Sequence, residues 1–145
     1  NEKYDIVVSN IPYSQKVEYG ALYDFPTDDG DSLFMQHIWK SVKKGGRIAV
    51  VVPDTFLYSS DTFDIRKKIV DESSKMIIIS LPRGVFNPYT PTKTSVIIAT
   101  KKAHKTEKST EASMYVIRNA FQLAQYLFHL KAGRCSLECF SIYYH

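Results

Sequence analysis

The amino-terminal part of the chain contains an apolar, β-branched run that ends abruptly in a polar turn. Residues 5–9 read Asp-Ile-Val-Val-Ser, and Asn10, Ile11, Pro12 and Tyr13 follow directly. Such a run, closed by an amide, a proline and an aromatic residue, is typical of a buried strand with a loop at its carboxyl end. Ligands of open α/β sheets bind at this end of the strands. We therefore expect the loop to be part of a functional site.

Helical and strand patterns alternate after this loop. The expected elements are a first strand over 4–9, a helix from Asp31 or Ser32 to Lys44 stopped by Gly45-Gly46, a strand over 47–53, a helix from Asp61 to Ser73, and strands over 75–81 and 94–100. The connection between the last two strands contains three prolines and no helical pattern, so the last strand is expected to return antiparallel, as a hairpin. This order predicts the α/β class, with a parallel sheet that ends in an antiparallel hairpin strand.

Length and composition fit one globular domain. The chain has 145 residues, of which 44% are apolar and 23% are charged, so it can bury a core and is not expected to be disordered. It begins only a few residues before a buried strand, which leads us to expect a fragment. Beyond residue 102 we expect a polar linker and tail over 103–145, with a short edge strand over 114–118 and a helix over 120–131.

Bulk features limit the kind of partner. No apolar run approaches the length of a membrane span, and the first residues do not resemble a signal peptide. A net charge of +4 and a pI near 9.0 permit a polyanionic partner, although the basic runs 66–68 and 101–108 are typical of solvated faces. Cys135 and Cys139 are four residues apart, which fits neither a paired zinc motif nor a redox Cys-x-x-Cys pair, so we expect reduced thiols.

Several segments together resemble one protein family. The loop Asn10-Ile-Pro-Tyr13 is similar to the Asn/Asp/Ser-Pro-Pro-Tyr/Phe loop of amino-methylating DNA methyltransferases. Later segments resemble the modification subunits of type I restriction systems and related adenine-specific DNA methylases. These segments are Asp31-Ser-Leu-Phe34, Lys44-Gly-Gly-Arg-Ile-Ala-Val-Val-Val-Pro53, Leu81-Pro-Arg-Gly-Val-Phe86 and Thr90-Pro-Thr-Lys-Thr-Ser95. The similarity covers about residues 4–101, and it implies that residues 1–102 are the carboxyl-terminal half of a methylase catalytic domain.

The resemblance implies a partial Rossmann-like fold that uses S-adenosylmethionine to methylate double-stranded DNA, in the cytoplasm of a bacterium or archaeon. It also implies specificity and restriction subunits as partners. Two features depart from the family pattern. Ile11 stands where the family has its first proline, and the glycine-rich loop and acidic residue that hold the cofactor in this family precede the first strand seen here. No cofactor-binding residue is therefore assigned.

By resemblance, the loop activates the exocyclic amine of adenine. This amine is a poor nucleophile because its lone pair is delocalised into the ring. The Asn10 side-chain oxygen and the backbone carbonyl of Ile11 would accept its two hydrogens and free the lone pair, a reaction that requires no metal. Pro12 favours an extended Ile11, so the change from proline to isoleucine is expected to weaken preorganisation without abolishing the reaction.

Three further residues complete the expected site. Tyr13 would stack on the flipped adenine, Phe86 would form a second aromatic wall, and Lys93 would contact a phosphate beside the pocket. Each has a plainer interpretation, as a core aromatic residue or a solvated hairpin lysine. Two other functions also stay open: methylation of a protein amide or an RNA amine by the same loop, and a non-catalytic remnant or interaction module that keeps the fold without binding cofactor.

Overall fold

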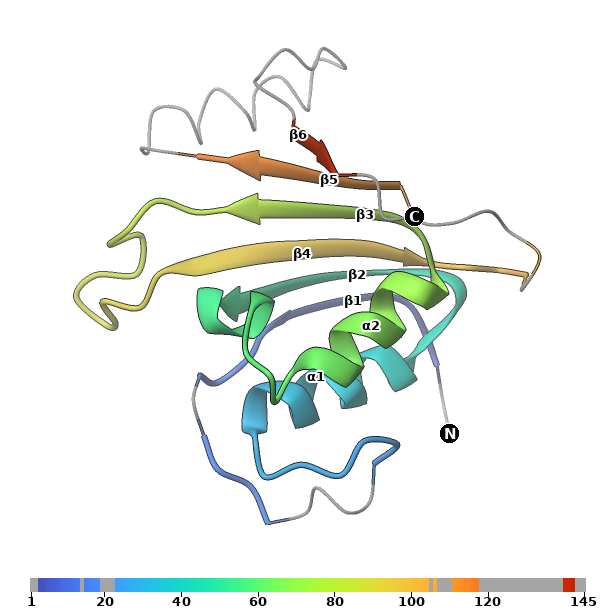
Figure 1. Cartoon of the computed structure of the whole chain (residues 1–145), viewed down its shortest axis with the longest axis horizontal. Helices are drawn as coiled ribbons and strands as arrows, with labels where there is room; N and C mark the ends of the chain where they lie inside the picture. Colours follow the sequence, from blue (N-terminus) through green and yellow to red (C-terminus); the bar gives the residue numbers. More distant parts are fainter. Residues whose placement is uncertain are drawn as a thin grey trace.

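A six-stranded mixed sheet organises the described part of the chain (Figure 1). The structure is a computed structural model, and it describes residues 3–13, 15–18, 23–104, 106, 111–117 and 140–142. The strands lie in the order β1-β2-β4-β3-β5-β6. Their bounds are Tyr4–Asn10 (β1), Val42–Pro53 (β2), Ser73–Ser80 (β3), Thr94–Lys101 (β4), Glu111–Val116 (β5) and Phe140–Ile142 (β6). β1 runs parallel to β2 and β3 parallel to β5, whereas β4 runs antiparallel to both its neighbours.

The predicted α/β class and the antiparallel return of the strand over 94–100 are confirmed. β4 forms a hairpin with β3 and inserts between β3 and β2, so it lies at the centre of the sheet. Its apolar sequence fits this position, because a central strand is buried on both faces.

Two helices cover the same face of the sheet (Figure 1). They are α1 (Gly30–Ser41) and α2 (Phe63–Glu72), and a short 3₁₀ turn, η2 (Asp54–Leu57), follows β2. Alternate residues of β2 point toward the helices, as the two-residue period of a strand requires. The resulting core contains Met35, Ile38, Trp39, Ile48, Val50, Val52, Ile65, Ile69 and Ile97.

The first helix begins and ends slightly earlier than the sequence predicts. Asp29 is its N-cap, because its Oδ1 accepts a hydrogen bond from the Ser32 N–H at 2.7 Å. The helix ends at Ser41 rather than Lys44, since Val42 is already extended and starts β2. The prediction that Gly45-Gly46 stop the helix is therefore wrong.

The two glycines instead lie in an irregular part of β2. Tyr4 of β1 pairs with Val42 and Ile6 pairs with Arg47, so the residues between Val42 and Arg47 bulge out of the ladder. Gly45 has a φ of 76°, a conformation that favours glycine. The second helix also starts later than expected, at Phe63 rather than Asp61.

The segment beyond residue 102 adds two strands to the same sheet. The predicted edge strand over 114–118 is present as β5, but it is not at the edge of the described sheet, because β6 pairs with its far side. No sequence pattern had indicated β6. The predicted helix over 120–131, Cys135 and Cys139 lie outside the described residues, and the domain boundary at residue 102 stays a prediction.

The face of the sheet opposite α1 and α2 is covered unevenly. Near β3 and β5 it carries a second, smaller core of Ile79, Leu81 and Ile117, against which Phe86 packs. β1 lies at the edge of the described sheet, and its Ile6 and Val8 side chains are exposed. The prediction that the first strand is buried is therefore wrong for the described residues. No helix in the described ranges has the length and apolar character that crossing a membrane requires.

Candidate active site

The carboxyl ends of three strands meet at one edge of the sheet. β1, β2 and β3 run in the same direction, because β2 and β3 are both antiparallel to β4, and they end at Asn10, Pro53 and Ser80 (left in Figure 1). The loop 10–13 follows β1 at this edge, and the connection 81–93, which carries Phe86 and Lys93, joins β3 to β4 here. The fold therefore brings every predicted site residue to the same edge.

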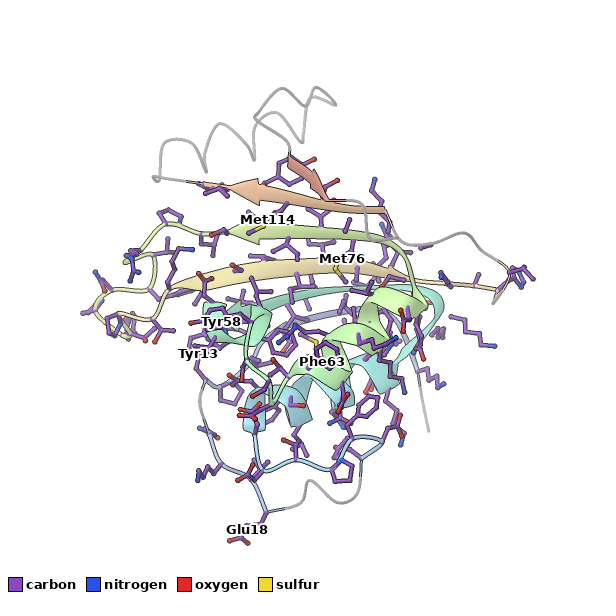
Figure 2. All side chains as sticks on the ribbon, in the orientation of Figure 1. Tyr13, Glu18, Tyr58, Phe63, Met76 and Met114 are labelled. Atoms are coloured by element: carbon purple, nitrogen blue, oxygen red, sulfur yellow. The ribbon has the colours of Figure 1, made fainter. Side chains whose placement is uncertain are left out.

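Asn10 and Tyr13 are joined directly. The Tyr13 hydroxyl donates a hydrogen bond to the Asn10 Oδ1 at 2.8 Å. Asn10 is exposed, whereas Tyr13 is half-buried and packs against the helix-side core. Figure 2 shows Tyr13 on the side of the molecule where β1, β2 and β3 end. Burial raises the pKa of Tyr13, and the nearby Asp31 carboxylate acts in the same direction, so the hydroxyl keeps its proton at neutral pH. The Asn10 oxygen is thus held at the strand tip by its own loop.

Ile11 anchors the loop to the core. Its side chain is only 3% exposed and packs in the helix-side core. Its N–H donates to the Val51 carbonyl at an N···O distance of 3.4 Å, a long bond that extends the β1–β2 ladder by one residue. Proline at this position could make no such bond because it has no N–H. The departure from the family loop therefore replaces a fixed backbone angle with buried apolar contact and a ladder bond.

Pro53 leaves the Ile11 carbonyl without a partner in the sheet. In a parallel ladder, a residue that donates to the carbonyl of residue j−1 accepts from the N–H of residue j+1. Ile11 donates to Val51, so its carbonyl would accept from residue 53, and a proline has no N–H to donate. The N–H of the following residue, Asp54, points the other way and donates to the Lys93 carbonyl on the β4 side. None of the described residues donates a hydrogen bond to the Ile11 carbonyl.

Lys93 belongs to a polar network that ties three strand ends together. Its Nζ lies 2.7 Å from the Asp54 Oδ2 and 2.6 Å from the Ser80 Oγ, and the Ser95 hydroxyl donates to the Asp54 Oδ1 at 2.7 Å. Both members of the ion pair are largely buried, with side-chain exposures of 29% for Lys93 and 26% for Asp54. An ammonium has three hydrogens, so two are used here. The predicted phosphate contact of Lys93 stays a prediction, and it would use the third hydrogen of the ammonium.

Asp54, Ser80 and Pro53 were not among the predicted site residues. Asp54 and Ser80 do carry a sequence signal, since each is polar and lies at the end of an apolar strand. The role of Pro53 carries no such signal, because it depends on which residue of the neighbouring strand lies opposite.

The two aromatic residues expected to hold the base lie apart. Tyr13 packs against the helix-side core, whereas Phe86 packs against the smaller core on the other face. No ring contact joins Tyr13 and Phe86, both of which the structure describes. Their joint role as the two walls of a base pocket stays a prediction.

The described residues do not form a cradle for S-adenosylmethionine. By resemblance, the family holds this cofactor on a glycine-rich turn that follows a strand. Of the described glycines, Gly30 begins α1, Gly45 and Gly46 lie at the amino end of β2, and Gly84 lies in the connection after β3. No two of them form a turn at the carboxyl end of a strand. In the same ranges, no group of three or more His, Cys, Asp or Glu side chains is arranged to hold a metal.

Known proteins resemble this chain in sequence and in fold. The methylase subunit of the type I restriction enzyme EcoEI of Escherichia coli is 37% identical over 106 residues, which is 70% of this chain and 22% of that subunit. The solved structure of the EcoKI M protein superposes with a TM-score of 0.71 at 31% identity and covers 82% of this chain and 26% of its own. A modification subunit of a putative type I restriction enzyme from Vibrio vulnificus YJ016 reaches a TM-score of 0.78 at 21% identity, over 97% of this chain and 34% of its own, which shows the fold alone.

The chain spans about a fifth of the length of the curated relatives that it matches. The family model described as N-6 DNA Methylase matches residues 1–131, which is most of the chain. The fold is that of the S-adenosylmethionine-dependent methyltransferases. The chain therefore belongs to the N-6 DNA methylase family.

Proposed function

We propose that this chain activates the exocyclic amine of a flipped adenine for methylation, as the target-base half of a type I modification subunit. The observation that carries the proposal is the pair of oxygen acceptors at the tip of β1. The Asn10 Oδ1 is on an exposed side chain, and the Ile11 carbonyl has no ladder donor because Pro53 lies opposite. Family membership supports the same chemistry.

The two acceptors belong to adjacent residues, so they can engage both hydrogens of one amine. A nitrogen whose two hydrogens are held by fixed oxygens is drawn toward tetrahedral geometry, and its lone pair leaves conjugation with the ring. The Asn10 oxygen has two lone pairs, so it can accept an amine hydrogen while Tyr13 still occupies the other. Because Ile11 is buried, its carbonyl moves little when the base arrives, which is the preorganisation that electrostatic catalysis needs.

The target base must first leave the duplex, which costs a few kcal/mol. Stacking on one aromatic ring contributes about 1–3 kcal/mol per base and offsets much of this. Tyr13 is the nearest aromatic residue in sequence to both acceptors. Its hydroxyl bonds to the Asn10 Oδ1, which supports a position of the ring close to the proposed amine site.

The methyl donor, the substrate and the partner subunits are proposed from the family resemblance. S-adenosylmethionine supplies the methyl group in this proposal. Double-stranded DNA is the substrate, and separate specificity and restriction subunits are the expected partners, as the family resemblance implies.

The test measures methyl transfer to duplex DNA by a polypeptide that continues upstream of this chain through a glycine-rich loop. Asn10→Ala should lower kcat by about 10²–10³-fold, the usual effect of removing one preorganised polar group. Asn10→Asp is the matched control, because it keeps an oxygen acceptor of the same length and should retain measurable activity. Circular dichroism of each variant checks that the fold is unchanged.

Three results would separate the alternatives. Unchanged DNA methylation in Asn10→Ala would refute the assigned role of the loop. Methylation of a glutamine-containing peptide or of RNA, without methylation of DNA, would identify the other substrate classes. A folded, upstream-extended protein that binds no S-adenosylmethionine in calorimetry would identify a non-catalytic module.

A further inference from the structure

A lysine-lined cavity lies at the edge of the sheet opposite the candidate active site. Its volume is about 520 Å³, and it is bounded by the last turns of α1 and α2, the starts of β1 and β2, and the end of β4 (right in Figure 1). This volume is within the range of small-molecule sites, about 300–1,000 Å³. We propose that the cavity binds an oligophosphate, the chemistry shared by inorganic triphosphate and the phosphate chain of a nucleotide.

The charge of the cavity comes from lysines that are far apart in the sequence. They are Lys3, Lys40, Lys44, Lys68, Lys101 and Lys102, and only three carboxylates line the same space. A second cavity, of about 380 Å³ at the Asn10 edge, has the reverse lining of four aspartates and a single lysine, Lys16. The two cavities therefore differ in the sign of the charge that lines them.

The three carboxylates of the cavity are already engaged. Asp24 pairs with Lys68 at 2.5 Å, and Asp71 pairs at 2.5 Å with Lys67, which does not line the cavity. Glu72 accepts the Trp39 indole N–H at 2.7 Å and lies 3.9 Å from the Lys101 Nζ.

Several lysines lack such a partner. Lys3, Lys40 and Lys44 form no ion pair within the described ranges. The Lys102 ammonium donates to a backbone oxygen, the Asp71 carbonyl, at 2.9 Å. The cavity therefore contains cationic groups without an anionic counterpart.

The negative ends of the helix dipoles offset only part of the positive charge of the cavity. Each helix C-terminus carries about half a negative charge, so the ends of α1 and α2 together offset about one lysine. Three more lysines than carboxylates line the cavity, which leaves an excess of about two positive charges. A single carboxylate would not neutralise this excess, whereas an oligophosphate concentrates several charges in a small volume and suits the point-like ammonium of lysine.

Lys101 is a largely buried lysine of the cavity. Its side chain is 16% exposed, its Nζ lies 4.8 Å from the centre of the Trp39 ring, and it donates to the Trp39 carbonyl at 2.9 Å. Burial lowers the pKa of Lys101, and the charges of Lys3, Lys68 and Lys44 lower it further, although Glu72 opposes them. The like charges thus repel one another, and a bound polyanion would relieve that repulsion.

The position of Trp39 provides a direct reporter. It lines the cavity and is the only tryptophan of the chain, so its fluorescence reports on this site alone. We expect inorganic triphosphate, titrated into the 145-residue chain, to change the emission along a saturable curve. Calorimetry of the same titration gives the affinity independently of any optical change. Orthophosphate should bind at least about tenfold more weakly, because it has fewer charges to contact the cluster.

Matched double variants separate this site from the general positive charge of the protein. Lys40→Gln with Lys44→Gln removes two exposed charges at the cavity and should weaken triphosphate binding about tenfold. Lys16→Gln with Arg83→Gln removes two exposed charges at the opposite edge and should change the affinity less than about twofold. Circular dichroism confirms that all variants stay folded.

The outcomes decide the proposal. Saturable triphosphate binding that only the cavity variant weakens would support it, and ATP in place of triphosphate then tests whether a nucleotide is accepted. Equal weakening by both variants would show non-specific attraction and overturn it. The proposal also fails if citrate, a tricarboxylate, binds as tightly as triphosphate, or if calorimetry detects no triphosphate binding.

Discussion

The ion pair between Asp54 and Lys93 should contribute measurably to stability, unlike an exposed pair. Both side chains are about three-quarters buried, and the Lys93 ammonium and the Ser95 hydroxyl each hold one oxygen of the Asp54 carboxylate. Exposed pairs couple by about 0.2–1 kcal/mol, and loss of one partner from a fully buried pair costs about 3–5 kcal/mol. The effect of a partly buried pair on the free energy of unfolding should lie between these limits. We expect Asp54→Asn and Lys93→Met each to lower the free energy of unfolding by about 2 kcal/mol, with a coupling energy of about 1.5 kcal/mol.

A double-mutant cycle measures this coupling. Urea denaturation followed by circular dichroism gives the free energy of unfolding of the parent chain, the two single variants and the double variant. The Lys67–Asp71 pair provides a matched control, because its ammonium and carboxylate are 2.5 Å apart but its side chains are 60% and 57% exposed. That helical i,i+4 pair should couple by only about 0.3–0.5 kcal/mol and should weaken in high salt.

The reasoning would be refuted if the Asp54–Lys93 coupling were no larger than that of the control pair. Lys93 would then be free to act mainly as a DNA ligand, as the sequence-based hypothesis of a phosphate contact supposes. A large coupling would instead show that Lys93 holds β2, β3 and β4 together at the Asn10 edge.

Three further outcomes follow from the structure. Ile11→Pro should destabilise the chain by about 1–2 kcal/mol, because it removes the N–H bond to Val51 and part of a buried side chain; equal or higher stability in urea would contradict this. Pro53→Ala supplies an N–H to the Ile11 carbonyl, so the new amide should be protected from hydrogen exchange and methylation should slow about tenfold; an unprotected amide would disprove the predicted bond. Trp39 emission should change in a pH transition centred below 10.5, the ordinary pKa of lysine, and Lys101→Met should abolish it. The pKa of Lys101 is lower in the folded chain than in the unfolded chain, where it has the ordinary value. Between these two pKa values the unfolded chain binds more protons than the folded one. The free energy of unfolding should therefore rise with pH across that interval in the parent and not in Lys101→Met.

Local sequence determined most of the elements and the candidate loop. Apolar β-branched runs predicted β2, β3 and β4, because a strand buried between neighbours needs such side chains, although β2 begins five residues before the predicted start. The same kind of run predicted β1, which lies instead at the edge of the described sheet. The Asn10–Tyr13 turn was found from local sequence too, since an amide, a proline and an aromatic residue directly follow the apolar run. The predicted end of the first helix failed because Val42 enters a strand directly, and Gly45 then serves a bulge.

Contacts between distant segments decided the rest. Pro53 matters because the register of β1 against β2 places it opposite the Ile11 carbonyl. Lys93 is tied to Asp54 and Ser80 because β4 inserts between β2 and β3, and the lysine cavity exists because several chain segments end at the same edge. Sequence patterns report the preference of each residue for burial or exposure and for local geometry. Which groups face one another depends on strand order and register, and these are set only when the whole sheet packs against its helices.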